Sequence, residues 1–243
     1  MVALSDYIQS TRRLLQNPPA PTSLYATSDL TAYINTARGQ LAGDAECIRL
    51  QATISCVVGT RVYNFSGLNT GVSATNGIQG VLSLRQMLYS VASGQQWVRP
   101  RGFEWFTLYK LNNPVPSSGP PQVWSQYGQG ASGSFYIDPL PDDTFTLSVD
   151  AVCYPIPLVD DNTVDAIPYI YSDAVPYFAA YMAFLSAQSG ARQNDANRML
   201  ELYTEFKNRA RRFSNSTVLP YSQPQTTDPT TVNQLGLQQP RVQ

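Results

Sequence analysis

The stretch that most constrains the fold is "DPLPDDTFTLSVDAVCYPIPL", residues 138–158. Between its prolines, apolar residues alternate with polar ones, which is the two-residue period of a strand with one buried and one solvated face. The apolar set is Phe145, Leu147, Val149, Ala151 and Cys153. Proline cannot continue a paired strand, so this strand must stop where the prolines return. After a short acidic link the chain becomes helical, and the fold must therefore combine strands with helices.

Helical periodicity marks both ends of the chain. "LSDYIQSTRRLLQN" predicts a short amphipathic helix, and "TSDLTAYINTARGQLAGDAECIRL" predicts a second helix that Thr27 or Ser28 can cap. "PYIYSDAVPYFAAYMAFLSAQSG" and "NDANRMLELYTEFKNRARRF" predict two more helices, the last with a clear apolar stripe. The apolar positions expected to pack in these helices include Leu30, Ile34, Leu41, Tyr181, Phe184, Tyr203 and Phe206.

The middle of the chain favours strands. From Gln51 it is rich in β-branched and aromatic residues. "VLSLRQMLYSVASG" is predicted as a strand, because the following "RPRGFEWFTLYKLNN" indicates a compact helix entered through Pro100. Three short runs separated by turn residues, "QVWSQYGQ", "SGSFYIDPL" and "TFTLSVDAVCYP", predict an antiparallel meander.

The last thirty residues differ from the rest. Pro and Gln recur at short intervals, charge is almost absent, and apolar residues are too few to bury, so this tail is expected to be disordered alone in solution. It could still hold an extended shape against a partner. Its anchors would be Val218, Leu219, Tyr221, Leu235 and Leu237.

These patterns predict an α+β fold. Its core is expected to be a helical bundle of two N-terminal and two C-terminal helices that carries a β-rich antiparallel insertion and an extended C-terminal tail. The expected parts are N-terminal helices at 1–50, the β-rich insertion at 51–158, C-terminal helices at 159–213 and the tail at 214–243.

The composition limits the ligands and reactions expected for this chain. A formal net charge of −1 gives no broad attraction to nucleic acid or anionic membrane. There is no leader-like start and no apolar run long enough to span a bilayer. The chain has no histidine and three scattered cysteines, Cys47, Cys56 and Cys153, which favours neither a zinc site nor a disulfide framework. We expect no cofactor, no metal and no enzymatic activity.

Three short motifs each have two interpretations. "GQGASG" at 128–133 matches a phosphate-binding loop in letters, but a strand follows it, which favours a hairpin tip. The pairs Asp142–Asp143 and Asp160–Asp161 could form a carboxylate dyad or a calcium site, whereas their Pro and Asn neighbours favour turns. Turn formation is the preferred interpretation for both pairs.

Charged and aromatic clusters also leave alternatives open. The basic group Lys207, Arg209, Arg211 and Arg212 is either a solvated helix end or a contact for DNA phosphates or a partner. Arg12, Arg13 and Arg38 are expected on solvated helix faces. The aromatic group Trp97, Phe103, Trp105, Phe106 and Tyr109 is expected in a core, with stacking on bases or sugars as the alternative.

An ordered set of motifs gives a resemblance to a known family. "LTAYINTARGQLAGD", "DPLPDDTFTLSVDAVCYPIPLVDD" and "IPYIYSDAVPYFAAYMAFLSA" follow one another in the order seen in the head-to-tail adaptor proteins of tailed bacteriophages. The chain resembles this connector family, which docks beneath the portal ring, to about residue 213. The long loop at 66–80 and the connector at 112–121 look like local elaborations.

The resemblance implies a structural, non-enzymatic protein of the virion neck, made in the host cytoplasm. It implies a ring of twelve copies that binds the portal protein and a tail nozzle or tube protein, while double-stranded DNA passes through the lumen without sequence-specific binding. Residues 214–243 would be the portal-binding arm, and no membrane is involved.

Two other functions remain as alternatives. One is another phage structural subunit, of the tail tube or baseplate, which would bind tail protein but not portal. The other is a carbohydrate-binding or hydrolytic module built on the aromatic and acidic residues of the β-rich part, which the absence of histidine disfavours.

Overall fold

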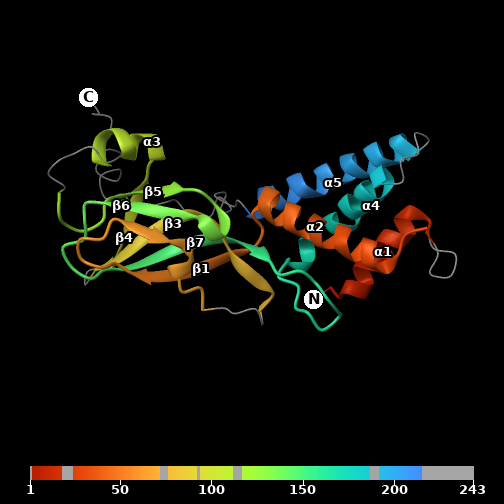
Figure 1. Cartoon of the computed structure of the whole chain (residues 1–243), viewed down its shortest axis with the longest axis horizontal. Helices are drawn as coiled ribbons and strands as arrows, with labels where there is room; N and C mark the ends of the chain where they lie inside the picture. Colours follow the sequence, from red (N-terminus) through yellow and green to blue (C-terminus); the bar gives the residue numbers. More distant parts are fainter. Residues whose placement is uncertain are drawn as a thin grey trace, which may run out of the picture.

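The computed structural model describes residues 2–17, 24–71, 76–91, 94–111, 117–186 and 192–214. Two parts lie side by side along the long axis of the molecule (Figure 1). One is a sheet with a short helix above it, and the other is a group of four longer helices. The connector that follows the last strand runs between them and leads back into the helices.

The described residues contain five α-helices. They are α1 (Leu4–Leu15), α2 (Thr27–Ala45), α3 (Phe103–Phe106), α4 (Ala174–Ser186) and α5 (Gln193–Ser214). α1, α2 and α5 all contact α4. Small side chains permit this close approach, since Ala179, Ala180 and Ala183 of α4 are fully buried. The helices therefore pack around the alanine-rich α4.

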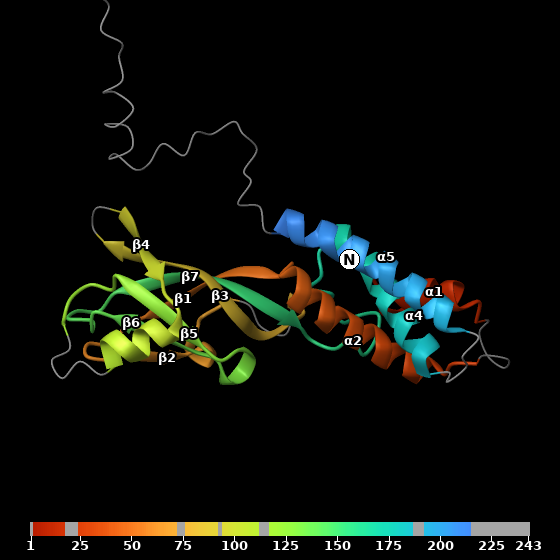
Figure 2. The ribbon, with the colours of Figure 1, turned by 90° about the horizontal axis from the view of Figure 1, so that it is seen from above.

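In the part of the chain that the structure describes, seven strands form one curled, mixed sheet in the order β1-β7-β3-β4-β5-β6-β2. They are β1 (Arg49–Ser55), β2 (Val62–Asn64), β3 (Ile78–Val91), β4 (Gly94–Pro100), β5 (Val123–Tyr127), β6 (Ser134–Asp138) and β7 (Thr146–Pro155). β4 and β5 pair in parallel, whereas the other neighbours are antiparallel. Three register shifts between β3 and β7 increase the local twist, and the curl is visible in Figure 2.

The edges of the sheet approach each other. Thr53, on the edge strand β1, forms a bridge with Asn69, which follows the opposite edge strand β2. Their backbones exchange two hydrogen bonds, of 2.9 and 2.8 Å. The sheet is therefore curled into a half-barrel.

The fold class expected from the sequence was wrong. The protein is built on a seven-stranded mixed sheet in a half-barrel, with five helices in the described residues, and not on a four-helix bundle core with an antiparallel insertion. One buried cluster extends from Leu4 and Tyr7 in α1 to Trp124 and Phe135 in the sheet. Helices and strands thus share a core. The part boundaries at 50, 158 and 213 remain a prediction.

Strand pairing also differs from the expected meander. β5 and β6 form the predicted hairpin, and the 128–133 motif lies at its tip. β7 does not follow them in space, because it pairs with β1 and β3. Its supposedly solvated face is partly covered, since Ser148 and Val152 are buried. A central strand loses its wet face where a neighbouring element covers it, and α2 contacts β7.

Several local predictions were confirmed. Residues 81–91 of the predicted strand lie within β3, whereas Gly94 begins the unpredicted strand β4. The segment after Pro100 forms α3, which continues as a π-helical turn at Thr107–Leu111. The capping prediction for α2 was wrong, because its N-cap is Ala26, without a side-chain hydrogen bond. Thr27 instead accepts a hydrogen bond of 3.1 Å from Arg12 of α1.

Candidate functional site

A buried ion pair joins the helices to the connector after β7. Arg38 of α2 donates to Asp165 through Nε at 3.1 Å and Nη2 at 2.7 Å, and each side chain is only 1% exposed. The prediction that Arg38 lies on a solvated face was therefore wrong. The sequence contained a signal, since Arg38 is four residues after Ile34 and three before Leu41, on the apolar stripe.

Other buried groups complete this network. The Tyr7 hydroxyl donates to Asp165 at 2.6 Å, and the backbone N–H of Ile167 donates to the same carboxylate at 3.0 Å. Arg38 also donates to the carbonyl of Ile156 at 2.8 Å. Burial, together with the nearby Asp165 carboxylate, raises the pKa of Tyr7, so the hydroxyl remains a donor. One carboxylate thus links α1, α2 and the connector.

Asn35 makes a second link, one turn earlier on α2. Its side-chain amide donates to the carbonyl of Leu158 at 3.0 Å and accepts from the N–H of Leu158 at 2.8 Å. Asn35 also accepts a hydrogen bond of 3.2 Å from Arg38. The paired residues of "YINTAR" therefore hold the backbone of "YPIPL", which gives a physical reason for the two motifs to occur together.

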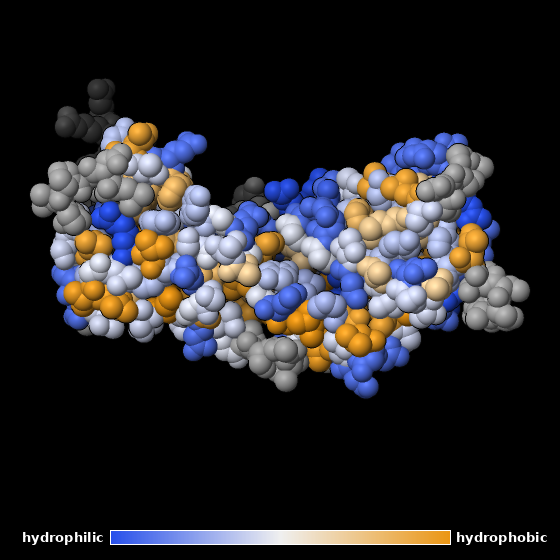
Figure 3. Space-filling view, in the orientation of Figure 1, coloured by the Kyte–Doolittle hydropathy of each residue, from blue (hydrophilic) through white to orange (hydrophobic). Residues whose placement is uncertain are grey.

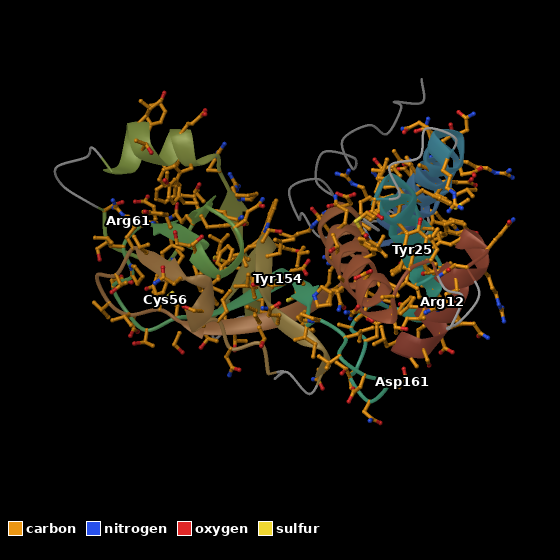
Figure 4. All side chains as sticks on the ribbon, turned by 45° about the vertical axis from the view of Figure 1, so that its right-hand side comes forward. Arg12, Tyr25, Cys56, Arg61, Tyr154 and Asp161 are labelled. Carbon is orange, nitrogen blue, oxygen red and sulfur yellow. The ribbon has the colours of Figure 1, made fainter. Side chains whose placement is uncertain are left out.

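One aspartate of each acidic pair, Asp143 and Asp160, accepts hydrogen bonds from nearby residues, as predicted for turn formers, whereas Asp161 contacts α1. The Asp160 carboxylate accepts hydrogen bonds from the Thr163 hydroxyl at 2.6 Å and from the N–H groups of Asn162 and Thr163 at 3.1 and 2.8 Å. The hydrogen bond from the Thr163 side chain is the main reason that the pKa of Asp160 is lowered. Asp161 accepts from the N–H of Ser5 at 2.7 Å, and Figure 4 shows it in the loop beside α1. Asp143 accepts from the N–H of Thr144 at 2.7 Å.

The basic group at the end of α5 divides into two kinds of residue. Lys207 lies 3.8 Å from Asp44 and 5.8 Å from the centre of the Tyr203 ring. Arg209, Arg211 and Arg212 are exposed, and their side chains form no ion pair with any residue of the described ranges.

The other predicted residues have varied surroundings. Leu30, Ile34 and Leu41 are fully buried, Phe184 and Tyr203 are buried, and Tyr181 and Phe206 are half-buried. Their packing lies within one protomer, and a role in a ring remains a prediction. The tail anchors Val218, Leu219, Tyr221, Leu235 and Leu237 lie outside the described residues.

The aromatic cluster is only partly a core. Phe106 is buried, and Phe103 packs on Tyr136 with ring centroids 5.1 Å apart. Trp97 and Tyr109 are instead 58% and 64% exposed. A groove of about 830 Å³ is lined by residues that include Trp97, Arg99, Arg101 and Phe145. The sequence pattern could not separate the buried rings from the exposed ones, because they are divided among a strand, a short helix and a π-helical turn.

All three cysteines are buried and free. Burial raises the pKa of Cys47 to about 12 and those of Cys56 and Cys153 to about 11, from 9.0. Cys56 lies in the sheet half of the molecule (Figure 4). Within the described ranges, no three His, Cys, Asp or Glu side chains converge as a metal site would require.

We expect the native thiols to react slowly with a disulfide reagent. At pH 8 the rate should be at least about 100-fold lower than in urea, because the thiolate is the reactive form and all three thiols stay protonated and covered. The folded state binds more protons than the unfolded state above about pH 9, so stability should fall as pH rises from there towards 11. Rapid labelling of one cysteine in the native protein would contradict this expectation.

Comparison with known proteins gives the family. The sequence profile of the SU10 adaptor protein family matches residues 2–228, which include all described helices and strands. None of the curated proteins compared with the chain matches it. No helix in the described ranges has the length and apolar character needed to cross a bilayer. The match covers more than nine-tenths of the chain, so this protein belongs to the SU10 adaptor protein family, a phage head-tail adaptor family, and is a structural phage protein.

Proposed function

We propose that this protein is a head-tail adaptor that forms a ring below the portal, joins the DNA-filled head to the tail, and lets DNA pass through its lumen. Membership of a head-tail adaptor family over residues 2–228 is the observation that carries the proposal. The ring, of twelve copies, would bind portal protein on one side and a nozzle or tube protein on the other. Its place would be the virion neck.

Exposed apolar side chains support contacts between copies. Val159, Tyr169 and Ile170, close together along the chain, are each more than 70% exposed. Apolar patches are also visible on both halves of the face shown in Figure 3. Patches of this kind mark interaction surfaces when they are larger than scattered single residues. Copies in a ring would cover them.

The portal contact is assigned to residues 214–243, the C-terminal arm. A single arm with a few apolar anchors would bind weakly, but a ring presents many arms at once and gains from their high effective concentration. Ordering the arm costs free energy when it binds, which favours assembly on the portal over assembly in free solution.

The lumen needs a surface that does not hold DNA tightly. A net charge of −1 and a charged content of only 14% suit this purpose, because tight DNA binding depends on clustered Lys and Arg. The exposed Arg209, Arg211 and Arg212 would make local contacts, either with passing DNA or with a partner. No catalytic step is part of this function.

Removing the arm tests the proposal. We expect a protein ending at Ser214 to bind portal at least about tenfold more weakly than the full chain, because the many-arm contact is lost. Portal affinity would be measured by surface plasmon resonance, and rings on portal would be counted in negative-stain images.

Two variants sharpen this test. Serine at the five anchors, Val218, Leu219, Tyr221, Leu235 and Leu237, should reproduce the loss, whereas asparagine at Gln223, Gln225, Gln234, Gln238 and Gln239 should retain binding. Equal portal affinity of the full chain and the truncated protein would overturn the role of the arm. Binding to tail protein without binding to portal would instead indicate a tail-tube or baseplate subunit.

A further inference from the structure

The last turn of α5 has little apolar support. Ala210 is its one fully buried residue, whereas Arg211 and Arg212 are exposed and Phe213 is 61% exposed. The final carbonyl groups of any helix also lack partners within the helix. A helix end of this composition frays unless groups from elsewhere hold it.

Within the described part of the chain, two polar contacts from outside α5 hold this end. Arg49, the first residue of β1, donates through Nη1 to the carbonyl oxygen of Ser214 at 2.9 Å. The Ser214 hydroxyl donates to the carbonyl oxygen of Ala45, the last residue of α2. The end of α5 is therefore attached to the segment that joins α2 to the sheet.

Arg49 is itself held in place by Asp150 of β7. Its Nε donates to Asp150 Oδ1 at 3.1 Å, and its Nη2 forms an ion pair with Oδ2. The two carboxylate contacts orient the planar guanidinium, which leaves Nη1 directed at Ser214. A cation at this position also interacts favourably with the negative end of the helix dipole.

We propose that Arg49 is a positioning residue that fixes the point at which the C-terminal arm leaves the protein. This inference rests on the proposed portal-binding role of the arm. If the last turn opens, the root of the arm moves by several ångströms and the arm gains conformational freedom. The effective concentration of the arm at the portal then falls.

The pair is partly exposed, with side-chain exposures of 36% for Arg49 and 23% for Asp150. Ion pairs at such sites contribute little to global stability. Loss of Arg49 should therefore open the last turn without unfolding the protein. An opened last turn in a protein of unchanged global stability would distinguish a positioning role of Arg49 from a general structural role.

Trypsin measures the opening directly, because it cleaves after Arg211 and Arg212 once the last turn unwinds. We expect R49A to accelerate this cleavage about fivefold to tenfold while the thermal midpoint stays within about 2 °C of the wild type. R85A is the control matched in kind, because Arg85 forms a partly exposed ion pair with Glu46, with side-chain exposures of 29% and 25%. It should leave the cleavage rate unchanged.

Portal binding tests the functional consequence. R49A should weaken portal binding of the full chain about threefold to tenfold, and R49K should restore only part of it, because lysine keeps a cation at the helix end but lacks the planar guanidinium that contacts Asp150 and Ser214 together. In the protein ending at Ser214, R49A should have no effect on portal affinity, because no arm remains to position.

The outcomes separate the two claims. If the full chain binds portal no better than the truncated protein, the proposed function of the arm fails. If the arm contributes to binding but R49A matches the wild type in cleavage and affinity, the role of Arg49 is overturned. A large fall in the thermal midpoint of R49A would show a global structural role and would also overturn it.

Discussion

Replacing Arg38 with methionine is expected to lower the free energy of unfolding by about 3–5 kcal/mol, because it leaves Asp165 as a buried carboxylate without a cation. The hydrogen bond to the carbonyl of Ile156 is lost at the same time. Together these changes weaken the attachment of the connector to α2 and leave it to the hydrogen bonds between Asn35 and Leu158. Urea denaturation, followed by circular dichroism, would measure the loss.

A matched set of variants isolates the buried charge. Arg13 lies on an exposed face of α1, so R13M should change the unfolding free energy by less than about 0.5 kcal/mol. The double variant R38M/D165L should be more stable than R38M, because no buried charge is left unpaired. If R38M lowers the free energy of unfolding by less than about 1 kcal/mol, the ion pair between Arg38 and Asp165 does not hold the connector.

Replacing Gly77 with alanine is the second change with a large expected effect, a loss of about 2–5 kcal/mol in unfolding free energy. Gly77 has φ +74°, and a Cβ atom there would lie 2.2 Å from the carbonyl oxygen of Val164. Backbone atoms of both segments would have to move. The carbonyl of Gly77 also accepts a hydrogen bond of 2.9 Å from Ile156, so the connector would shift as well.

Gly59 provides the control for backbone strain. Its φ is +73°, but a Cβ atom would meet nothing within 4 Å. G59A should therefore cost only the strain of the left-handed conformation, about 1–2 kcal/mol. Denaturation curves of the two variants, measured side by side, give the cost of the contact with Val164. Equal losses of unfolding free energy in G77A and G59A would show that the close contact of Gly77 with Val164 does not contribute to stability.

Local sequence patterns predicted individual elements well. The strand at Thr146–Pro155, the apolar stripe of α2 and a turn-forming aspartate, Asp160, were all found in the structure, although the predicted solvated face of the strand is partly buried. Each of these features depends on residues within one or two turns of one another. Backbone geometry and nearby hydrogen bonds therefore decide them.

Pairing and burial were not predictable in this way. The position of β7 between β1 and β3, and the parallel pairing of β4 with β5, join segments far apart in the chain. The burial of Arg38 depends on Asp165, which lies 127 residues away. The apolar stripe of α2 places Arg38 on the buried face, but the pattern of one helix does not identify the distant carboxylate that pairs with it.

The candidate site likewise combines features that the sequence predicts with contacts that only the tertiary structure shows. The family resemblance came from ordered motifs, and the profile match over residues 2–228 confirmed the family. The contact between Arg49 and Ser214 spans 165 residues and has no sequence signal. Only the assembled sheet and helices bring these two residues together.

The sequence by itself determined the four long helices, several of the strands, the turn at Asp160, and the family to which the protein belongs. The tertiary structure alone decided that a curled mixed sheet is the basis of the fold, that Arg38 and Asp165 close the connector onto the helices, and that Arg49 meets the end of α5. The physical reason is that backbone propensity acts over a few residues, whereas strand order, buried charge pairing and helix anchoring depend on contacts between distant segments.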